Sequence, residues 1–422
     1  MEGKAVILIS SVLCVWFSLD VSAEEARFDN YKVFRAVPTT EDQMHFLREL
    51  SEGTEGISFW KAPTRLRSPV DIMVPPHKLP DFREAAGLLN LDTEVLIQDV
   101  QEAIYNERPS AARRVEGFDW TDYHGLEQMY SWMDSLIKQH SGVASLIIGG
   151  SSFEGRQIRG VKISHKSGNP GVYVEGGIHA REWISPATVT FILNQLLKSS
   201  DPDVRDIAEN YDWYIFPSVN PDGYVYSHKK NRLWRKTRSR SSATCFGVDP
   251  NRNWDFFWNV TGTSGNPCSD IYAGPKPFSE IETRTLSSYI TTIAKKIDVF
   301  LAFHSYSQLL LLPYGNGSLG VDNFSTLVDI GTRAMEKLSK RYGTRYTTGN
   351  IVDVIYPASG ISMDWARSSF KIPFTFTYEL RDTGRHGFLL PAKLIIPTGE
   401  ETLDSVVSIL QDVRGYSWKT TS

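Results

Sequence analysis

The spacing of apolar residues divides the chain into two stretches with different predicted structures. In the first stretch, alternating or short apolar runs predict four strands, over residues 31–37, 57–60, 70–74 and 94–97. Two helices lie among them: one begins at a capping box formed by Thr40 and Gln43, and the other covers residues 80–89. This order of strands and helices is typical of a small ferredoxin-like α+β domain.

The second stretch contains roughly 300 residues, which is large for a domain but possible as one α/β unit. Its buried-strand candidates are residues 172–175, 213–217, 299–303 and 373–378. Helical spacing of apolar residues covers, for example, residues 126–140 and 186–197. Strands that alternate with helices favour a mixed or parallel sheet with helices on both faces.

A short polar and basic segment separates the two stretches. Residues 107–114 (ERPSAARR) are small, polar or charged, which is typical of an exposed linker. A trypsin-like protease would cut after Arg113 or Arg114. From these residues alone, a plain interdomain linker is the better-supported interpretation.

The first 23 residues have the features of a secretory signal peptide. Lys4 precedes an apolar run over residues 5–19, and Val21-Ser22-Ala23 is a small-residue cleavage site. A membrane anchor is the alternative, but the run is shorter than the roughly 20 apolar residues that span a bilayer. No later segment is long and apolar enough, so we expect a soluble secreted protein.

Cysteine usage and charge agree with that expectation. Cys14 lies in the predicted signal peptide, so the mature chain keeps Cys245 and Cys268, an even pair in an oxidising compartment. The formal net charge of −4 gives no global electrostatic reason to expect a nucleic-acid partner. Three sequons, each weak alone, also fit secretion; they begin at Asn259, Asn316 and Asn323.

Candidate metal ligands follow two of the predicted strands. His179 and Glu182 come directly after the strand at residues 172–175 and can bind one cation together, although His-x-x-Glu is common by chance. His304 follows the strand at residues 299–303, and open α/β sheets build sites from different strand ends. Two His and one Glu leave a fourth zinc position free, which is typical of catalytic sites.

Two further segments carry candidate chemistry. Glu379 follows an apolar run and can act as a general base beside a metal, although a surface ion pair with Arg381 is the more common fate of Glu-x-Arg. The basic run at residues 229–240, followed by Asn251-Arg252-Asn253, fits a solvated loop, a nucleic-acid patch or a substrate site. A guanidinium group can grip a carboxylate with two hydrogen bonds or stabilise an oxyanion.

Taken together, these segments resemble the zinc carboxypeptidases of the A/B family, closest to the pancreatic and insect digestive members. The resemblance runs from YKVFRAVP to FLLPAKLIIPTGEET. Its motifs, in family order, are GGIHAREW, NRLWRKTRS, VDPNRNWD, HSYSQLLLLPYG, IYPASG and YELRDTGRHGFLLP.

The resemblance implies a fold and a set of domain boundaries. The implied fold class is α/β, with a mixed eight-stranded sheet flanked by helices, preceded by a small ferredoxin-like α+β propeptide domain. The implied boundaries are a signal peptide over residues 1–23, a propeptide over 24–114 and a catalytic domain over 115–422. The resemblance therefore favours processing after Arg113 or Arg114 over a plain linker.

The resemblance also implies roles for individual residues. It implies one zinc ion per chain, bound by His179, Glu182 and His304. Glu379 would be the general base that activates water, and Arg238 would polarise the scissile carbonyl. Asp249 would orient His179, Cys245 and Cys268 would form a disulfide, and Arg181 would help bind substrate residues upstream of the cut. The other implied substrate-binding residues are Ser305 and Tyr306, a carboxylate clamp of Asn251, Arg252 and Tyr356, and a side-chain pocket of Gly315, Ile351, Ile355, Met363 and Thr377.

The implied function is that of a secreted zymogen which hydrolyses the C-terminal peptide bond of its substrates. Met363 stands where basic-specific members carry Asp, so an apolar pocket would favour aromatic or aliphatic C-terminal residues. Asp353 lies close by in the sequence and keeps a B-type preference for Lys or Arg open. Ile361 stands where the pancreatic A-type pattern has Gly, so its side chain could narrow the pocket.

The alternative from another functional class is a non-catalytic family member that only binds peptides. Such a member would lack a zinc ligand or the general base, and this sequence has all of them. The expected partners are peptide C-termini and an activating trypsin-like protease. We expect a monomer that binds neither nucleic acid nor a membrane.

Overall fold

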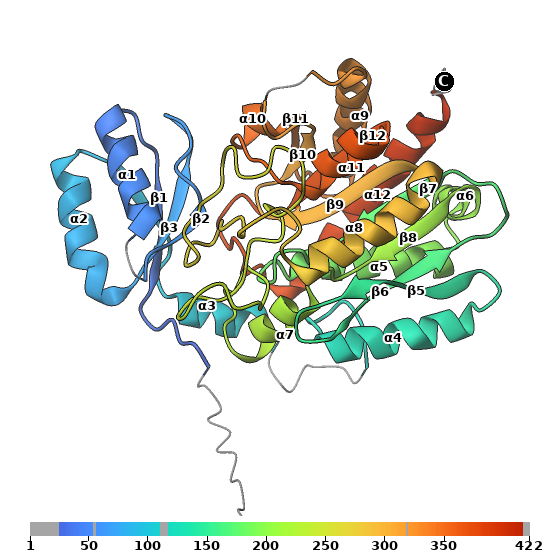
Figure 1. The fold of residues 1–422 in the computed structure, drawn as a ribbon, viewed down its shortest axis with the longest axis horizontal. Coiled ribbons are helices and arrows are strands. Elements are labelled where there is room, and N and C mark those ends of the chain that lie inside the picture. Colours follow the sequence, from blue (N-terminus) through green and yellow to red (C-terminus); the bar gives the residue numbers. More distant parts are fainter. Residues whose placement is uncertain (1–24, 54–55, 110–116, 318–319, 417–422) are drawn as a thin grey trace, which may run out of the picture.

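The computed structural model describes residues 25–53, 56–109, 117–317 and 320–416. A small N-terminal domain packs against one side of a large domain (Figure 1). The predicted signal peptide and the expected cleavage sites at Arg113 and Arg114 lie outside the described residues. Among the described helices, none combines the length and apolar character needed to cross a bilayer.

The small domain has the predicted ferredoxin-like architecture. Its antiparallel sheet has the order β2-β3-β1-β4, and its elements are β1 (Lys32–Ala36), α1 (Glu41–Gly53), β2 (Ser58–Lys61), β3 (Val70–Val74), α2 (Leu79–Leu88), β4 (Thr93–Ile97) and α3 (Val100–Glu107). The capping box is confirmed: Gln43 N donates to Thr40 Oγ1 and Thr40 N donates to Gln43 Oε1, both at 3.3 Å. Helix α3 was not predicted from the sequence; Asp99 caps its N-terminus, and the Asp99 carboxylate accepts from Glu102 N at 3.1 Å.

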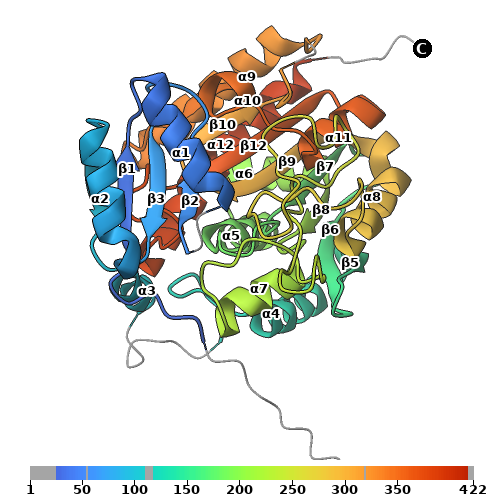
Figure 2. The same ribbon diagram turned by 60° about the vertical axis from the view of Figure 1, so that its left-hand side comes forward.

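Both faces of the small sheet are covered, which explains why every residue of β3 is buried. Phe34 and Ile72 face α1 and α2, which lie on the side away from the large domain (Figure 2). Their neighbours Val33 and Met73 point to the opposite face, where they join a cluster that includes Phe388 of the large domain. The alternation of side chains along two strands therefore builds both the core of the small domain and its contact surface.

The large domain contains the predicted mixed sheet flanked by helices. Its eight strands have the order β11-β10-β12-β9-β7-β8-β6-β5; they are β5 (Ala144–Ser151), β6 (Gln157–Ile163), β7 (Gly171–Glu175), β8 (Asp212–Phe216), β9 (Ile297–Ser305), β10 (Leu309–Leu312), β11 (Thr347–Asn350) and β12 (Phe374–Leu380). The central strands β12, β9, β7 and β8 are parallel to one another. All residues of β7 and β8 are buried, as expected for strands covered on both faces.

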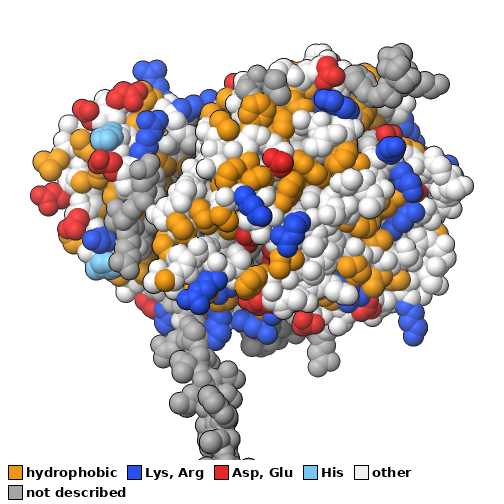
Figure 3. All heavy atoms as spheres, in the orientation of Figure 1, with side chains coloured by type: hydrophobic (Ala, Val, Ile, Leu, Met, Phe, Trp, Pro, Cys, Tyr) orange, Lys and Arg blue, Asp and Glu red, His pale blue; other side chains and the backbone are white. Residues whose placement is uncertain are grey.

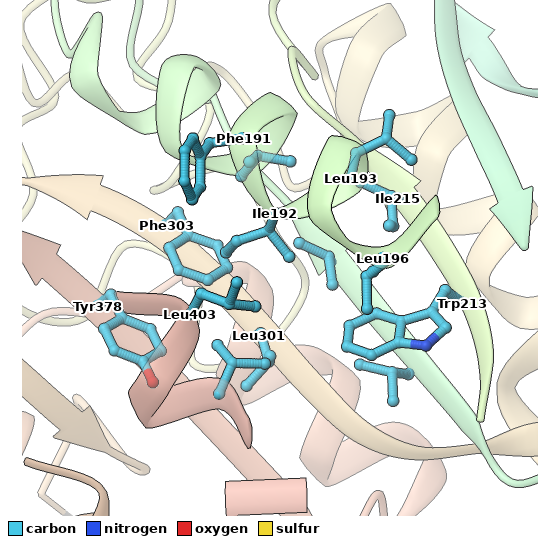
Figure 4. Packing of buried hydrophobic residues seen from close by; sticks show 14 of the residues in the cluster. Phe191, Ile192, Leu193, Leu196, Trp213, Ile215, Leu301, Phe303, Tyr378 and Leu403 are labelled. Carbon is cyan, nitrogen blue, oxygen red and sulfur yellow. The ribbon is translucent and has the colours of Figure 1, made fainter. Parts of the chain in front are cut away.

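Helices cover both faces of this sheet. They are α4 (Leu126–Gln139), α5 (Ile184–Lys198), α6 (Pro202–Asn210), α7 (Pro221–Lys229), α8 (Ile281–Ile293), α9 (Phe324–Tyr342), α10 (Ile351–Val354), α11 (Ser362–Phe370) and α12 (Ile395–Arg414). On one face, Phe191 and Ile192 of α5 pack with Phe303 of β9, Tyr378 of β12 and Leu403 of α12 (Figure 4). On the other face, α8 and α11 cover a second cluster. The parallel strands are thereby held rigidly, with their carboxyl ends at one edge.

A buried ion pair joins the two domains at the end of α3. Arg232 donates to both carboxylate oxygens of Glu107, with Nε–Oε2 at 2.7 Å and Nη2–Oε1 at 2.5 Å. Both side chains are almost completely buried. The prediction of an exposed linker from residue 107 is therefore wrong at its first residue, because Glu107 belongs to a helix and has a charged partner in the large domain.

The structure bears on the expected disulfide and on one of the three sequons. Cys245 and Cys268 form a disulfide, with their Cα atoms 5.1 Å apart. The sequon at Asn323 is not accessible in the folded chain, because the Asn323 side chain is 4% exposed and hydrogen-bonds to Pro373 O and Arg367.

In the space-filling view, apolar, basic and acidic side chains are interspersed over the visible face (Figure 3).

We expect Glu107→Ala to destabilise the chain by about 3–5 kcal/mol, because Arg232 would stay buried without its counter-charge. Thermal unfolding of the unprocessed chain measures this effect. The control Asp29→Ala breaks an ion pair with Arg27 whose side chains are 49% and 58% exposed, so it should change the unfolding temperature little. Equal shifts for the two variants would contradict the assignment.

Candidate functional site

The candidate site lies where three parallel strands end. His179 and Glu182 follow β7, His304 lies near the end of β9, and Glu379 lies near the end of β12, directly opposite His304 in the strand register. Gly177 makes the turn after β7 with a φ of 63°. A φ in this left-handed range favours glycine, and a Cβ there would also lie tightly against Pro217 O, at 3.1 Å.

Three buried side chains could hold a metal ion at this point. One ligand atom from each of His179, Glu182 and His304 lies within 4.8 Å of the others. The Nδ1 atom of His179 lies 2.8 Å from Glu182 Oε1 and 3.2 Å from His304 Nδ1. Two imidazole nitrogens and a carboxylate oxygen are a typical zinc donor set. Burial also lowers the pKa of His179, which favours the neutral ring that binds metals.

Asp249 lies directly behind the candidate metal ligands and is fully buried. Its Oδ1 accepts from His179 Nε2 at 3.1 Å, and its Oδ2 accepts from Arg235 Nη2 at 2.9 Å. Burial alone would raise the pKa of Asp249, but the charges of Arg235 and His179 hold it well below its usual range. An ionised Asp249 can orient the His179 ring and increase its basicity, as expected from the sequence.

Arg238 does not face this site, although the sequence analysis selected it for the scissile carbonyl. Its Cζ lies 3.6 Å from the ring centroid of Tyr226 and 4.5 Å from that of Trp234, outside the residues that line the cavity. Arg235, which the sequence analysis missed, lines the cavity, and its Nη1 lies 3.7 Å from Glu182 Oε1. The segment between α7 and α8 has no regular period, so spacing alone could not show which arginine faces the metal ligands.

Asn251, Arg252 and Tyr356 come together on another wall of the cavity. Arg252 Nη2 donates to Tyr356 Oη at 3.2 Å, and Arg252 Nε donates to Gly262 O at 2.8 Å. Asn251 Nδ2 lies 3.5 Å from His304 Nε2, so this wall adjoins the candidate metal site. A guanidinium, an amide and a phenol can together bind a carboxylate.

Glu379 lines the cavity beside the candidate metal ligands. Burial is the main cause that raises its pKa to about 8, despite the opposing charge of His304. A carboxyl group with a raised pKa can both take and return a proton near neutral pH.

The end of the cavity beyond the clamp is mainly apolar. Its lining includes Leu311, Ile351, Ile355, Ala358, Ile361 and Thr377. Met363 lies buried behind Thr377, whose hydroxyl donates to the Met363 sulfur at 3.3 Å. Asp353 is exposed and does not line the cavity, so its position gives no support to a basic-specific pocket.

The small domain covers the opening of this cavity. Phe59, Trp60, Lys61 and Ala62, in and just after β2, line it together with the large domain. Tyr306 Oη donates to Asp71 Oδ2 at 2.7 Å, and Asp71 also accepts two hydrogen bonds from Arg35, both at 2.7 Å. The expected binding residues Arg181, Ser305 and Tyr306 line this covered part. The small domain therefore occupies space that a longer substrate would need.

Two sequence families match the chain. The zinc carboxypeptidase family matches residues 129–405, and the carboxypeptidase activation peptide family matches residues 34–107. The first match covers most of the large domain, and the second covers most of the small domain. They agree with the division into domains that the fold shows.

Individual relatives extend this likeness to almost the whole chain. Zinc carboxypeptidase A 1 of Anopheles gambiae is 47% identical over 412 residues, which is 96% of this chain and 95% of that protein. Carboxypeptidase B of Astacus astacus is 45% identical over 299 residues, which is 70% of this chain and 98% of that protein. The crystal structure of carboxypeptidase A from Helicoverpa armigera superposes with a TM-score of 0.84 at 27% identity, over 93% of this chain and 99% of that chain.

We expect His304→Ala to lose zinc, because two remaining ligands bind a cation weakly. Asp249→Asn should keep the ligands but weaken zinc binding about 10–100-fold, because His179 loses its ionised partner. Metal analysis after dialysis against a graded chelator measures both effects. His45→Ala is the control, since His45 is exposed and pairs with the exposed Glu49. Full zinc retention by His304→Ala would show that the ion binds elsewhere.

Proposed function

The chain belongs to the zinc carboxypeptidase family, and we propose that it removes residues with apolar side chains from the C-termini of peptides once its N-terminal domain has been cleaved off. The observation that carries this proposal is one cavity shared by a buried His-Glu-His group and an Asn-Arg-Tyr wall. Hydrolysis of C-terminal residues and a zinc cofactor are properties of the family. The roles of individual residues and the preference for apolar side chains are our proposals.

Arg252, Asn251 and Tyr356 are proposed to bind the substrate's terminal carboxylate. A free carboxylate occurs only at the end of a chain, so this contact would restrict cleavage to the last peptide bond. The short distance from Asn251 Nδ2 to His304 Nε2, 3.5 Å, supports this role because it places the clamp beside the proposed metal ligands. Gly360 supports it too: a Cβ there would lie 2.3 Å from Arg252 O, so glycine lets the chain that follows Tyr356 pack against the clamp.

Glu379 and Arg235 are proposed to carry out the chemistry with the metal. When bound by His179, Glu182 and His304, zinc would supply a Lewis acid beside the scissile carbonyl. Glu379 would take a proton from the attacking water and deliver it to the leaving amine. Arg235 replaces Arg238 in the proposal for the carbonyl, because its guanidinium faces the cavity and can stabilise the developing oxyanion.

The pocket is proposed to select C-terminal residues by size and polarity. Its apolar lining would leave a Lys or Arg side chain without a charged partner, at a desolvation cost. Ile361 lines this pocket and lies against Gly315, so its side chain takes up part of the pocket. Apolar C-terminal residues, aliphatic or aromatic, therefore fit this proposal. Because a relative named carboxypeptidase B is 45% identical, release of Lys or Arg must be tested beside it.

The small domain is proposed to act as an activation domain in a secreted zymogen. Residues 24–114 would form this domain after removal of residues 1–23, and residues 115–422 would form the active enzyme. Trp60 and Lys61 support the proposal because they line the cavity that substrate would use. A trypsin-like protease would cut after Arg113 or Arg114, which lie outside the described residues. We further propose that the active enzyme is a monomer.

We expect the trypsin-treated chain to release Leu and Phe, but little Lys or Arg, from peptides that differ only in their last residue. A chelator should abolish release. Met363→Asp should gain release of Lys and Arg, because it adds a carboxylate behind Thr377. Amino-acid analysis of the products measures each rate. No release of any residue after activation would reject the proposed activity, and release of Lys or Arg alone would reject the apolar pocket.

We expect Arg235→Ala to lower kcat/KM about 10²–10³-fold, because one donor to the oxyanion is lost. Arg238→Ala should lower it less than about tenfold, because Arg238 packs against Tyr226 and Trp234 outside the cavity. Steady-state kinetics with the same peptide compares the two variants. The opposite order would restore Arg238 to the role predicted from the sequence.

A further inference from the structure

A buried carboxyl group lies behind the proposed carboxylate clamp. Glu175 is the last residue of β7, is 1% exposed, and does not line the cavity. Its Oε2 accepts a hydrogen bond from Tyr173 Oη at 3.1 Å, and its Oε1 accepts one from Ser362 Oγ at 2.5 Å. Both donors are neutral hydroxyl groups. Burial of a carboxyl group is costly, so these two hydrogen bonds offset part of a desolvation penalty that an apolar residue would not carry.

Ser362 connects this carboxyl group to Asn251. Ser362 is the first residue of α11 and is 1% exposed. Its backbone N–H donates to Asn251 Oδ1 at 3.1 Å, and Asn251 N donates to Asp249 Oδ1 at 2.9 Å. An amide whose oxygen accepts from Ser362 must turn its NH₂ group the other way. The Asn251 Nδ2 atom accordingly points toward His304 and the cavity.

The same anchor holds the end of the side-chain pocket. Ile361 and Met363 flank Ser362 in the chain, and Ile361 lines the cavity. The Ser362 side chain is tied to Glu175, and its backbone is tied to Asn251. Movement of Ser362 would therefore disturb the clamp and the pocket wall together.

We propose that Glu175 is a positioning residue that acts through Ser362 to aim the Asn251 amide at the terminal carboxylate of the substrate. This inference rests on the proposed function of Asn251. The end of β7, which precedes the proposed metal ligands, would then also contribute to substrate recognition. The two oxygens of Glu175 then have separate roles: Oε1 serves the clamp, whereas Oε2, bonded to Tyr173, serves only the packing of β7.

The test compares the affinities of N-acetyl-leucine and N-acetyl-leucinamide for the trypsin-treated full chain, measured by calorimetry. The wild type should bind the acid more tightly than the amide. In Glu175→Leu the ratio of the affinity for the acid to that for the amide should fall about tenfold, as expected for one weakened hydrogen bond. For peptide cleavage, KM should rise by a similar factor while kcat changes less than about threefold, and the zinc content should stay unchanged.

Three variants separate positioning from packing. Glu175→Gln keeps an oxygen that can accept from Ser362, so it should retain most of the preference. Tyr173→Phe removes the other hydrogen bond and should lower stability without changing the preference. Ser362→Ala should reproduce the loss, and the double variant Glu175→Leu with Ser362→Ala should lose no more than either alone.

An unchanged acid-over-amide preference in Glu175→Leu would overturn the inference, as would an equal loss in Tyr173→Phe. If Glu175→Leu does not fold, Ser362→Ala decides alone, and a wild-type preference in that variant overturns it. A wild type that binds both ligands equally would overturn it too. A wild type that prefers the acid but releases no residue from any peptide would refute the proposed activity, while the variants would still decide the inference by binding.

Discussion

The buried carboxylate of Asp249 joins the parts of the site that the proposed chemistry needs together. Its two oxygens accept hydrogen bonds from His179, from Arg235 and from the backbone of Asn251. One side chain thereby connects a proposed metal ligand, the cation proposed to act on the scissile carbonyl and the proposed carboxylate clamp. Because a buried carboxylate needs partners for both oxygens, a shift of any of the three groups would leave Asp249 partly unsatisfied. This constraint restricts the movement of the three groups relative to one another.

The sheet supplies the frame for this network, and the small domain uses the same frame to cover it. The parallel strands β7, β9 and β12 end at one edge, so residues far apart in the chain converge there. The small domain contacts that edge through the hydrogen bond between Asp71 and Tyr306, and the ion pair of Glu107 with Arg232 is a second attachment. Arg232 also donates to Arg181 O at 2.8 Å and to Phe388 O at 2.7 Å, and both of these residues line the cavity. The second attachment therefore also reaches the cavity wall, and removal of Glu107 would leave Arg232 held by these two backbone oxygens.

Much of the fold and site was predictable because the decisive patterns are local. The capping box at Thr40 and the continuous apolar run of β7 need only neighbouring residues. Features set by long-range contacts were missed. The sequence around Glu107 is polar, as in a linker, and its ion-pair partner Arg232 lies far away in the chain. The sequence predicted Arg238 near the carbonyl, whereas Arg235 lines the cavity, because an irregular segment gives no period from which a facing side can be inferred. The link from Glu175 through Ser362 to Asn251 joins three distant segments and has no signature in the sequence.

Anomalous diffraction at the zinc edge, from crystals of the trypsin-treated chain with N-acetyl-leucine, tests the central claim most directly. The account predicts one strong peak, at about 2.0–2.2 Å from the ligand atoms of His179, Glu182 and His304. It also predicts the ligand's carboxylate on Asn251 and Arg252, with Asp249 still bonded to His179 and Arg235. A peak bound by other residues, or a carboxylate held elsewhere in the cavity, would contradict the account.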